Sequence, residues 1–261
     1  MAVISVLGAK GGCGVSLLAT NLGVALAAED SCLLIDLNPL LGYDDLLLDV
    51  SIQKTWLDLL PVAGELTEHH LELAIASHAS GLRLLGAPQQ RGGKVRRVDL
   101  VKLLKGLRAR FQWILLDMSS ARMDLMAAAF TDTDLLLLLS TLDPQSLRAA
   151  KRLAQELPQE LSQNTGMAFN QIMPGHPVKP KAVVASLGLP LLAELPYDQR
   201  AVGRQVNFGG PCVADSRSHY GRAVVQLAAR LSVAAARGQT SASGEDRMQL
   251  VGGDKAKEDA A

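Results

Sequence analysis

Aromatic residues are scarce in this sequence: they make up 3% of its 261 residues, although 48% of the residues are hydrophobic. The interior must therefore be built mainly from Leu, Val and Ala. Cysteine is also scarce, and Cys13, Cys32 and Cys212 form no C-x-x-C pair, which argues against a disulfide framework and against a zinc or iron–sulfur site. An excess of charge is missing as well, because 26 basic residues balance 26 acidic ones. The composition as a whole thus gives no reason to expect nucleic acid or an anionic membrane as a partner.

Long hydrophobic runs are also missing. The most apolar run, residues 135–139, is bracketed by Asp134 and Asp143 and is far shorter than the roughly 20 residues of a transmembrane helix. The N-terminus leads directly into an apolar stretch, residues 2–7, without a basic flank or a cleavage site, so we predict a first strand and not a signal peptide. We therefore expect a cytoplasmic protein without a transmembrane segment.

Short apolar runs alternate with helical patterns along the chain. The runs are apolar at every position, which is typical of strands covered on both faces. They occupy residues 2–7, 32–35, 82–85, 113–116, 135–139, 167–169 and 191–195, and helical patterns occupy residues 17–28, 98–110, 145–155 and 181–187. This order predicts an α/β fold, namely a doubly wound, mainly parallel sheet with helices on both faces. In such a sheet, ligands bind beyond the carboxyl ends of the strands.

The length suits one sizeable α/β domain. We expect this domain to span residues 1–236 and to close with an amphipathic helix at residues 217–237. Beyond it the chain is small, polar and charged, which predicts a disordered tail over residues 237–261.

A glycine-rich turn joins the first predicted strand to the first predicted helix. It reads Gly-Ala-Lys-Gly-Gly-Cys-Gly-Val-Ser over residues 8–16. In a phosphate-binding loop, backbone N–H groups of the loop and of the helix N-terminus point at phosphate oxygens, and glycines let the backbone come close. Ser16 is placed to give its hydroxyl to Mg²⁺. The sequence predicts nucleotide contacts from Lys10, Gly11, Gly12, Cys13, Gly14, Val15, Ser16 and Leu17.

The loop departs from the usual pattern G-x-x-x-x-G-K-[ST], because Val15 stands where the lysine is expected. A second lysine, Lys10, lies early in the loop. The run 10–16 resembles the deviant Walker A motif of the MinD/ParA family, K-G-G-x-G-K-[ST], without its second lysine, and the resemblance extends to about residue 236. In that family the early lysine crosses a dimer interface to the partner's nucleotide, so the resemblance implies this role for Lys10.

Acidic residues follow two further strands. Leu-Leu-Ile-Asp36-Leu-Asn38 resembles the D-x-D switch segment of the family, with Asn38 at the position that normally helps orient the attacking water. An amide cannot accept a proton as a carboxylate can. Trp-Ile-Leu-Leu-Asp117 has the Walker B form, in which an apolar strand delivers a carboxylate to Mg²⁺. The resemblance implies that Ser16, Asp36 and Asp117 support the metal, and Lys10, Asp36 and Asn38 are the predicted, degenerate catalytic set.

Two short matches concern the base. Asn170 follows a strand, as in the adenine-reading segment of the family, and Leu-Pro196-Tyr-Asp198 resembles the family's I-P-x-D stretch beside the base. The resemblance thus implies a site for ATP and Mg²⁺ that has lost two parts needed for hydrolysis. Loss of one charged group from such a site typically costs on the order of 10²- to 10⁵-fold in rate. We expect ATP binding by a nucleotide-dependent homodimer that is at most a slow ATPase.

A phosphate loop that keeps the first lysine and lacks the second resembles that of the CpaE/TadZ group. These proteins localise the machinery of tight-adherence (Flp/Tad) pili. Residues 80–88, 142–148 and 207–211 are also similar to that group. The expected partners are then pilus or secretion assembly proteins, at a polar or inner-membrane position reached through them. That group often carries a receiver-like N-terminal domain, which this chain does not show. The cellulose-synthesis BcsQ branch also tolerates loss of this lysine and stays open, as does any other MinD-like localisation factor.

Other functions remain as alternatives. An active partition ATPase would need DNA, for which the basic cluster over residues 91–97 is the best support; we interpret the cluster as a solvated helix entrance and expect no stable DNA binding. An iron–sulfur relative would need paired cysteines. A membrane-binding MinD would need bulky apolar residues in the closing helix, which is instead rich in small residues, so we expect this helix to pack on the domain. A nucleotide-independent scaffold is the last alternative.

Overall fold

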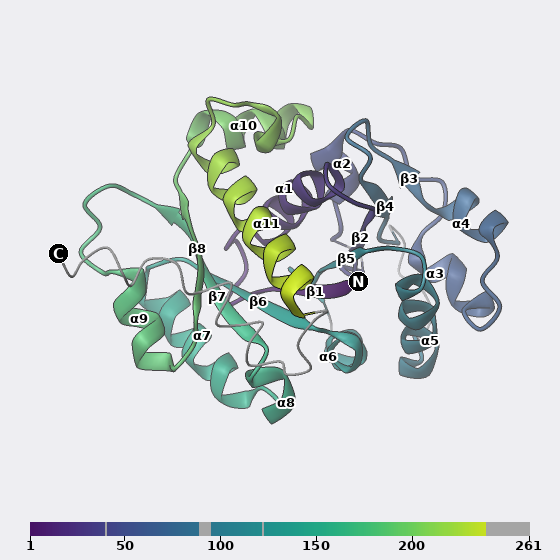
Figure 1. Ribbon diagram of the computed structural model, residues 1–261, viewed down its shortest axis with the longest axis horizontal. Helices are drawn as coiled ribbons and strands as arrows, with labels where there is room; N and C mark the ends of the chain where they lie inside the picture. The colour runs from purple at the N-terminus through teal and green to yellow at the C-terminus, as the bar shows by residue number, and fades with distance from the viewer. Residues whose placement is uncertain (40, 89–94, 122, 239–261) are drawn as a thin grey trace.

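The computed structural model describes residues 1–39, 41–88, 95–121 and 123–238 (Figure 1). Nearly all of the predicted tail, from residue 239 onward, lies outside the described residues, as do residues 91–94 of the basic cluster.

An eight-stranded sheet runs through the centre of the molecule, in the order β3-β4-β2-β5-β1-β6-β7-β8. All neighbouring strands are parallel except β3 and β4, which are antiparallel. The predicted mainly parallel, doubly wound sheet is therefore confirmed. The strands are β1 (Ala2–Gly8), β2 (Cys32–Asp36), β3 (Ala76–Ser77), β4 (Arg83–Leu85), β5 (Trp113–Asp117), β6 (Leu135–Ser140), β7 (Thr165–Ile172) and β8 (Leu191–Pro196).

The continuous apolar runs are explained by two cores, one on each face of the sheet. Successive side chains of a strand point to opposite faces, and in β1 Val3 and Leu7 enter one core while Ile4 and Val6 enter the other. The central strands β2, β5 and β6 alternate in the same way. Because both faces are covered by helices, both sets of positions are mainly apolar, and the buried Ser5 of β1 has its hydroxyl paired with that of Thr133.

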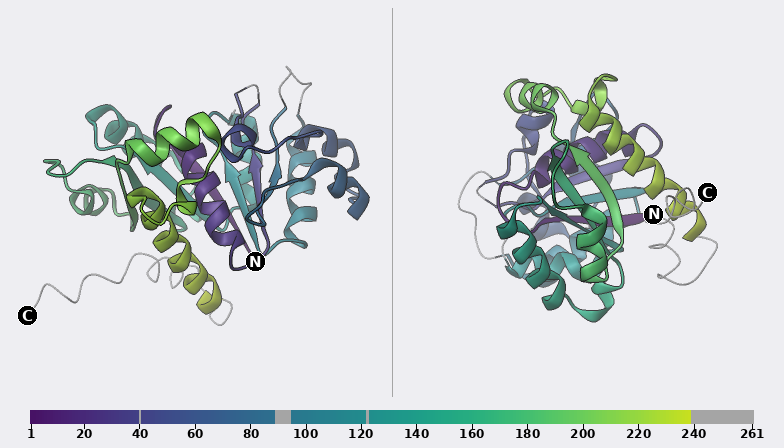
Figure 2. Two further views of the ribbon diagram at one scale, coloured as in Figure 1. Left: turned by 90° about the horizontal axis from the view of Figure 1, so that it is seen from above. Right: turned by 90° about the vertical axis from the view of Figure 1, so that its left-hand side faces the viewer.

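Helices cover both faces, as Figures 1 and 2 show. The core of the first face includes residues of α3 (Trp56–Leu59), α4 (Glu68–Ala74), α5 (Arg97–Arg108), α6 (Met123–Ala129), α7 (Pro144–Glu156), α8 (Gln159–Ser162) and α9 (Pro180–Leu187). The core of the second face includes residues of α1 (Val15–Ala27), α2 (Asp44–Leu48), α10 (Gln199–Phe208) and α11 (His219–Gly238). The sequence did not predict α10, β3 or the shorter helices α2, α3, α4, α6 and α8; most of these are too brief to show a period.

The closing helix α11 packs against α1 and β8, as the sequence predicted. Its buried positions include Tyr220, Val224, Leu227 and Leu231, all in the core of the second face. Within the described part of the chain, no helix combines the length and the apolar character that crossing a bilayer requires.

Candidate nucleotide site

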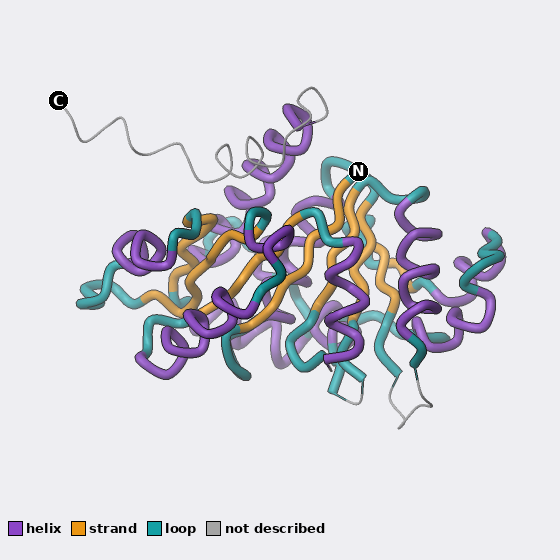
Figure 3. Tube along the Cα trace, turned by 90° about the horizontal axis from the view of Figure 1, so that it is seen from below, coloured by secondary structure: helices purple, strands orange, loops and turns teal. Residues whose placement is uncertain are grey.

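The loops that follow the parallel strands gather along one edge of the sheet, the edge away from the N-terminus in Figure 3. Carboxyl ends of parallel strands meet at a common edge, where open α/β sheets bind ligands. The loop after β1 lies in the middle of this edge, because β1 pairs with β5 on one side and with β6 on the other.

The loop between β1 and α1 has a backbone that requires glycine at defined positions. Gly12 and Gly14 have φ angles of +81° and +90°, a region that other residues rarely adopt. Gly14 is also the N-cap of α1, and a Cβ there would overlap the side-chain amide of Asn170. At Gly11 a Cβ would meet nothing within 4 Å, so the chain does not close over the loop at that point.

Asn170, predicted to face adenine, is hydrogen-bonded to the loop. Its side-chain Nδ2 donates to the carbonyl oxygen of Cys13 over 2.8 Å, and its Oδ1 accepts the backbone N–H of Gln171. Asn170 is buried and also lines the pocket beside the loop. Cys13 is buried as well, with its sulfur 3.5 Å from the Ser146 hydroxyl. Asn170 therefore fixes the loop against β7, and its role toward a base stays a prediction.

Lys10 forms an ion pair within the same chain. Its Nζ lies 3.0 Å from Oδ2 of Asp143, the N-cap residue of α7, and both side chains are partly exposed. The Thr141 hydroxyl and the Ser146 N–H also donate to Asp143. These bonds, and then Lys10 itself, hold the pKa of Asp143 well below its ordinary range. The lysine predicted to cross to a partner thus has an intramolecular counterion.

Val15 and Ser16 begin α1. Val15, at the position of the missing lysine, is buried in the core of the second face, where its side chain approaches Gly8. Ser16 is also buried and donates its hydroxyl to the hydroxyl of Ser119 over 3.1 Å. Ser119 in turn donates its N–H to Asp117. The hydroxyl predicted to bind Mg²⁺ is therefore linked to the Walker B carboxylate through one residue.

Three buried carboxylates come together at the ends of β2 and β5. Asp36 and Asp117 are register partners in these neighbouring strands. Asp44, the first residue of α2, brings a third carboxylate, and ligand oxygens of the three lie within 4.8 Å of one another. Burial, and then the Asp117 charge, raise the pKa of Asp36 to about 7, although hydrogen bonds from Asn38 and Asp44 oppose the shift. Carboxylate oxygens are the ligands that Mg²⁺ prefers, so this donor set fits the predicted metal.

Asp44 is a site residue that the sequence did not predict. An acidic pair, Asp44 and Asp45, stands before three leucines, and acids at the start of a helix are ordinarily explained by the helix dipole. Its burial could not be foreseen. Burial, and then the charges of Asp117 and Asp36, raise the pKa of Asp44 well above its ordinary value.

Asn38 links two loops at this edge. Its Nδ2 donates to Asp36 over 2.7 Å, and its Oδ1 accepts the N–H of Ser120 over 2.6 Å. The side chain is buried. Both ends of the amide are therefore occupied in joining the segment after β2 to the segment after β5.

A pocket of about 470 Å³ lies beside the loop, on the side of β7 and β8. The predicted residues Pro196 and Asp198 line it together with the exposed ring of Tyr197. Asp198 also has a structural task, because its carboxylate caps α10 through the Ala201 N–H and accepts the Ser218 hydroxyl. The other lining residues are Lys10, Gly12, Cys13, Gly14, Val15, Leu17, Tyr43, Leu47, Ser119, Asn170, Gln171, Gln199, Val202, Gly203, Val206, Asn207 and Tyr220.

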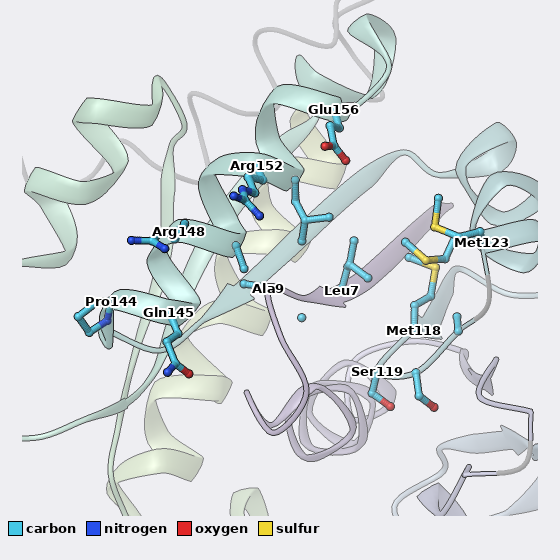
Figure 4. Close-up of a pocket in the computed structure, with 16 residues that line it drawn as sticks. Leu7, Ala9, Met118, Ser119, Met123, Pro144, Gln145, Arg148, Arg152 and Glu156 are labelled. Atoms are coloured by element: carbon cyan, nitrogen blue, oxygen red, sulfur yellow. The ribbon is translucent and has the colours of Figure 1, made fainter.

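A second pocket, of about 610 Å³, lies on the opposite flank of the loop that follows β1. It lies between α6 and α7. Figure 4 shows Met118 and Met123 on one side of it, and Arg148 and Arg152 on successive turns of α7 on the other. It contains none of the predicted loop contacts from Lys10 to Leu17. The first pocket, in contrast, is lined by six of these predicted contacts: Lys10, Gly12, Cys13, Gly14, Val15 and Leu17.

The basic cluster is described only in part. Arg96 forms an ion pair with Asp99 over 2.7 Å, and Arg97 begins α5. Arg96 and Arg97 therefore lie at the start of a helix, as the sequence predicted for this cluster.

The sheet order and the glycine loop between β1 and α1 define the fold as that of the MinD/ParA P-loop NTPases. The ParA family ATPase of Chlorobium tepidum superposes with a TM-score of 0.78 at 20% identity, over 88% of this chain and 98% of that one. MinD of Pyrococcus horikoshii, solved with Mg-ADP, superposes with a TM-score of 0.77 at 23% identity, over 93% of this chain and 99% of that one. The MinC:MinD complex of Aquifex aeolicus gives a TM-score of 0.76 at 24% identity, over 89% of this chain and 96% of the matched chain.

Residues 1–181 match the protein family described as cellulose biosynthesis protein BcsQ, and the chain belongs to this family. An uncharacterized protein of Mycobacterium tuberculosis is 29% identical over 211 residues, which are 80% of this chain and 58% of that protein. The chain thus spans somewhat more than half the length of the curated relatives that it matches.

Proposed function

We propose that the protein binds ATP·Mg²⁺ and acts as a nucleotide-gated, dimeric localisation or assembly factor with weak or no ATP hydrolysis. One observation carries the proposal: Gly12 and Gly14 of the loop after β1 have the positive φ angles that a phosphate-binding turn would use, while Val15, at the position of the lysine, is buried in the core. The nucleotide-binding domain is proposed to span residues 1–236.

Nucleotide binding is supported by the loop and by the pocket beside it. The backbone N–H groups of Gly11–Ser16 lie in the loop and at the start of α1, and the N-terminus of a helix favours anions. The base would lie in the pocket lined by Asn170, Pro196 and Asp198, and Ser16, Asp36 and Asp117 would hold Mg²⁺. The structural relative from Pyrococcus horikoshii was solved with Mg-ADP, and another, McdA of Cyanothece, with ATP.

Weak hydrolysis is supported by two residues that cannot act on the terminal phosphate. Val15 offers no cation, and its side chain is enclosed in the core. Asn38 offers no base, because its amide donates to Asp36 and accepts from Ser120. When bound, Mg²⁺ would neutralise charge on the phosphates and help to orient them.

The dimer would close over nucleotide with Lys10 reaching the partner's site. In the isolated chain Lys10 is held by Asp143 over 3.0 Å, so dimerisation would exchange one anionic partner of Lys10 for another. Both side chains of the pair are partly exposed, and such a pair costs little to open.

The machine served is proposed to be a Flp/Tad pilus, on the sequence similarity of residues 80–88, 142–148 and 207–211. A second candidate is a cellulose-synthesis machine, which the family match over residues 1–181 favours. Deletion of the gene in its native host separates the two: loss of surface pili supports the first, and loss of cellulose with pili intact supports the second.

Titration calorimetry with ATP·Mg²⁺ tests the proposed function. We expect micromolar binding and slow phosphate release. The variant Asn38→Asp restores the family's carboxylate and is expected to raise phosphate release, by at least tenfold, with little change in affinity. If no binding occurs at millimolar nucleotide, the loop is a relic and the protein is a nucleotide-independent scaffold.

A further inference from the structure

Asp44 is the least compensated charge at the loop edge. Its side chain is fully buried, and neither carboxylate oxygen accepts a hydrogen bond. One oxygen of Asp117, which is equally buried, also has no partner. By contrast, Asp36 receives the amide of Asn38 and the N–H groups of Asn38 and Asp44.

The three carboxylates have no cationic partner in the part of the chain that the structure describes. Among the ion pairs of the described residues, none joins Asp36, Asp44 or Asp117 to a basic side chain. Buried charges are ordinarily paired or bound to metal, because removal from water costs several kcal/mol per ion. The unpartnered oxygens of Asp44 and Asp117 therefore require a positive ligand or a proton.

The chain is shaped to bring Asp44 to this place. A Cβ at Gly42 would overlap both Ala87 and the carboxylate of Asp36. The segment after β2 can therefore lie this close to Asp36 only because residue 42 is glycine. The N–H of Asp44 then donates to Asp36, and its side chain lies with those of Asp36 and Asp117.

We propose that Asp44, together with Asp36 and Asp117, forms a site for a hard divalent cation that fills without nucleotide. The proposal shares Asp36 and Asp117 with the proposed function, but it adds a third ligand and a state of the protein that needs no ATP.

The spacing of the donors suits such a cation. Oxygens bound at 2.0–2.1 Å in an octahedron lie about 3 Å apart when adjacent and about 4 Å apart when opposite. The ligand oxygens of the cluster lie within 4.8 Å of one another, so small side-chain shifts complete the geometry, and water fills the other positions.

Cation binding would also hold α2 against the nucleotide pocket. Asp44 is the first residue of α2, and Tyr43 and Leu47 beside it line the pocket. Gln205 of α10 donates to the carbonyl oxygen of Leu47 over 3.3 Å and to the hydroxyl of Thr20 in α1. The cation would therefore fix one wall of the pocket before nucleotide arrives.

The test is Mn²⁺ binding to the full chain without nucleotide, followed by electron paramagnetic resonance, with Mg²⁺ as competitor. We expect one saturable Mn²⁺ site that Mg²⁺ displaces, and a melting temperature that rises with Mg²⁺. Asp44→Asn should weaken Mn²⁺ binding at least tenfold and yet melt higher than wild type in metal-free buffer, because it removes a repelling charge. Asp45→Asn, the same change one position along α2, should leave both values near wild type.

Absence of saturable Mn²⁺ binding to the wild type overturns the proposal without use of any variant and leaves a shared proton as the neutralising partner. Unchanged Mn²⁺ binding by Asp44→Asn also overturns it. Failure of ATP binding with intact Mn²⁺ binding would instead overturn the proposed function alone.

Discussion

The polar side chains on the two flanks of the phosphate loop differ in how completely they are hydrogen-bonded. Toward β6, β7 and β8, the amide of Asn170 is bonded at both ends, and the carboxylates of Asp143 and Asp198 each accept several donors. Toward β2 and β5, Asp44 accepts nothing and Asp117 is half satisfied. Asn170, Asp143 and Asp198 thus have their hydrogen bonds made within the chain, and we call their side of the loop the complete flank, although the buried phenol oxygen of Tyr220 there has no partner. Asp44 and Asp117 lack such bonds.

This difference separates architecture from ligand binding. A buried polar group that is complete in the free chain stabilises the fold, and its removal leaves partners unsatisfied. A buried carboxylate without a partner destabilises the free chain, and it is retained where a ligand completes it. Substitutions on the first flank should therefore weaken the free protein, whereas loss of a carboxylate on the second flank should strengthen it.

The largest effect is expected for Gly14→Ala on the complete flank. The new Cβ would overlap the amide of Asn170, and φ is +90°, so strain and overpacking together should lower the free energy of unfolding by about 2–4 kcal/mol. Urea denaturation without ligand measures it. Gly11→Ala is the matched control, because its Cβ meets nothing within 4 Å and should cost no more than about 0.5 kcal/mol. Equal losses for both variants would show that the bond between Asn170 and the loop is not what shapes the loop.

An intermediate effect is expected for Asp198→Ala, which removes the N-cap of α10 and should cost about 1–2 kcal/mol at neutral pH. Although burial opposes the shift, hydrogen bonds from Ala201, Ser218 and Tyr220 lower the pKa of Asp198. A lowered folded pKa means that this contribution is present above the unfolded pKa and is lost as the pH falls through the folded one.

Asp198→Asn separates the cap from the charge. Asn is also a good N-cap, so this variant should keep most of the stability at neutral pH while losing part of the steep decline in stability below about pH 4, near the ordinary Asp pKa. Unfolding followed from pH 7 to pH 2 measures both variants. An acid decline identical to that of the wild type would mean that Asp198 carries no charge-dependent stability.

The sheet and the phosphate loop could be predicted because their signals are local. Strands between two cores are apolar at every position, and the glycines of the loop stand in consecutive sequence between a strand and a helix. The adjacency of Asp36 and Asp117 follows from strand order in this fold, which the resemblance supplied. These features could be predicted because each is determined by residues adjacent in sequence or by the strand order of the fold.

The rest of the site depends on contacts that no short pattern encodes. The ion pair between Lys10 and Asp143 joins residues 133 positions apart. Asp44 was missed because its burial follows from Gly42, which lets the chain pass against Asp36, and nothing in the local sequence distinguishes it from the half-buried Asp45. Asn170 was predicted from a short match, but its bond to Cys13 arises only when β7 lies beside the loop.

The smallest effect is expected for Asp143→Asn. This variant tests whether Lys10, which is paired with Asp143 in the free chain, can leave that carboxylate for the partner's nucleotide. Asn keeps a cap for α7 but releases Lys10, whose ion pair with Asp143 is partly exposed. Exposed pairs contribute roughly 0.2–1 kcal/mol, so ATP-dependent dimerisation followed by analytical ultracentrifugation should strengthen by about two- to fivefold at most. Lys10→Ala is the control and should dimerise less well than the wild type. If Lys10→Ala dimerises as well as the wild type, Lys10 does not cross the interface. If only Asp143→Asn has no effect, the Asp143 carboxylate and the partner's nucleotide do not compete for Lys10, and the ion pair belongs to the architecture of the complete flank.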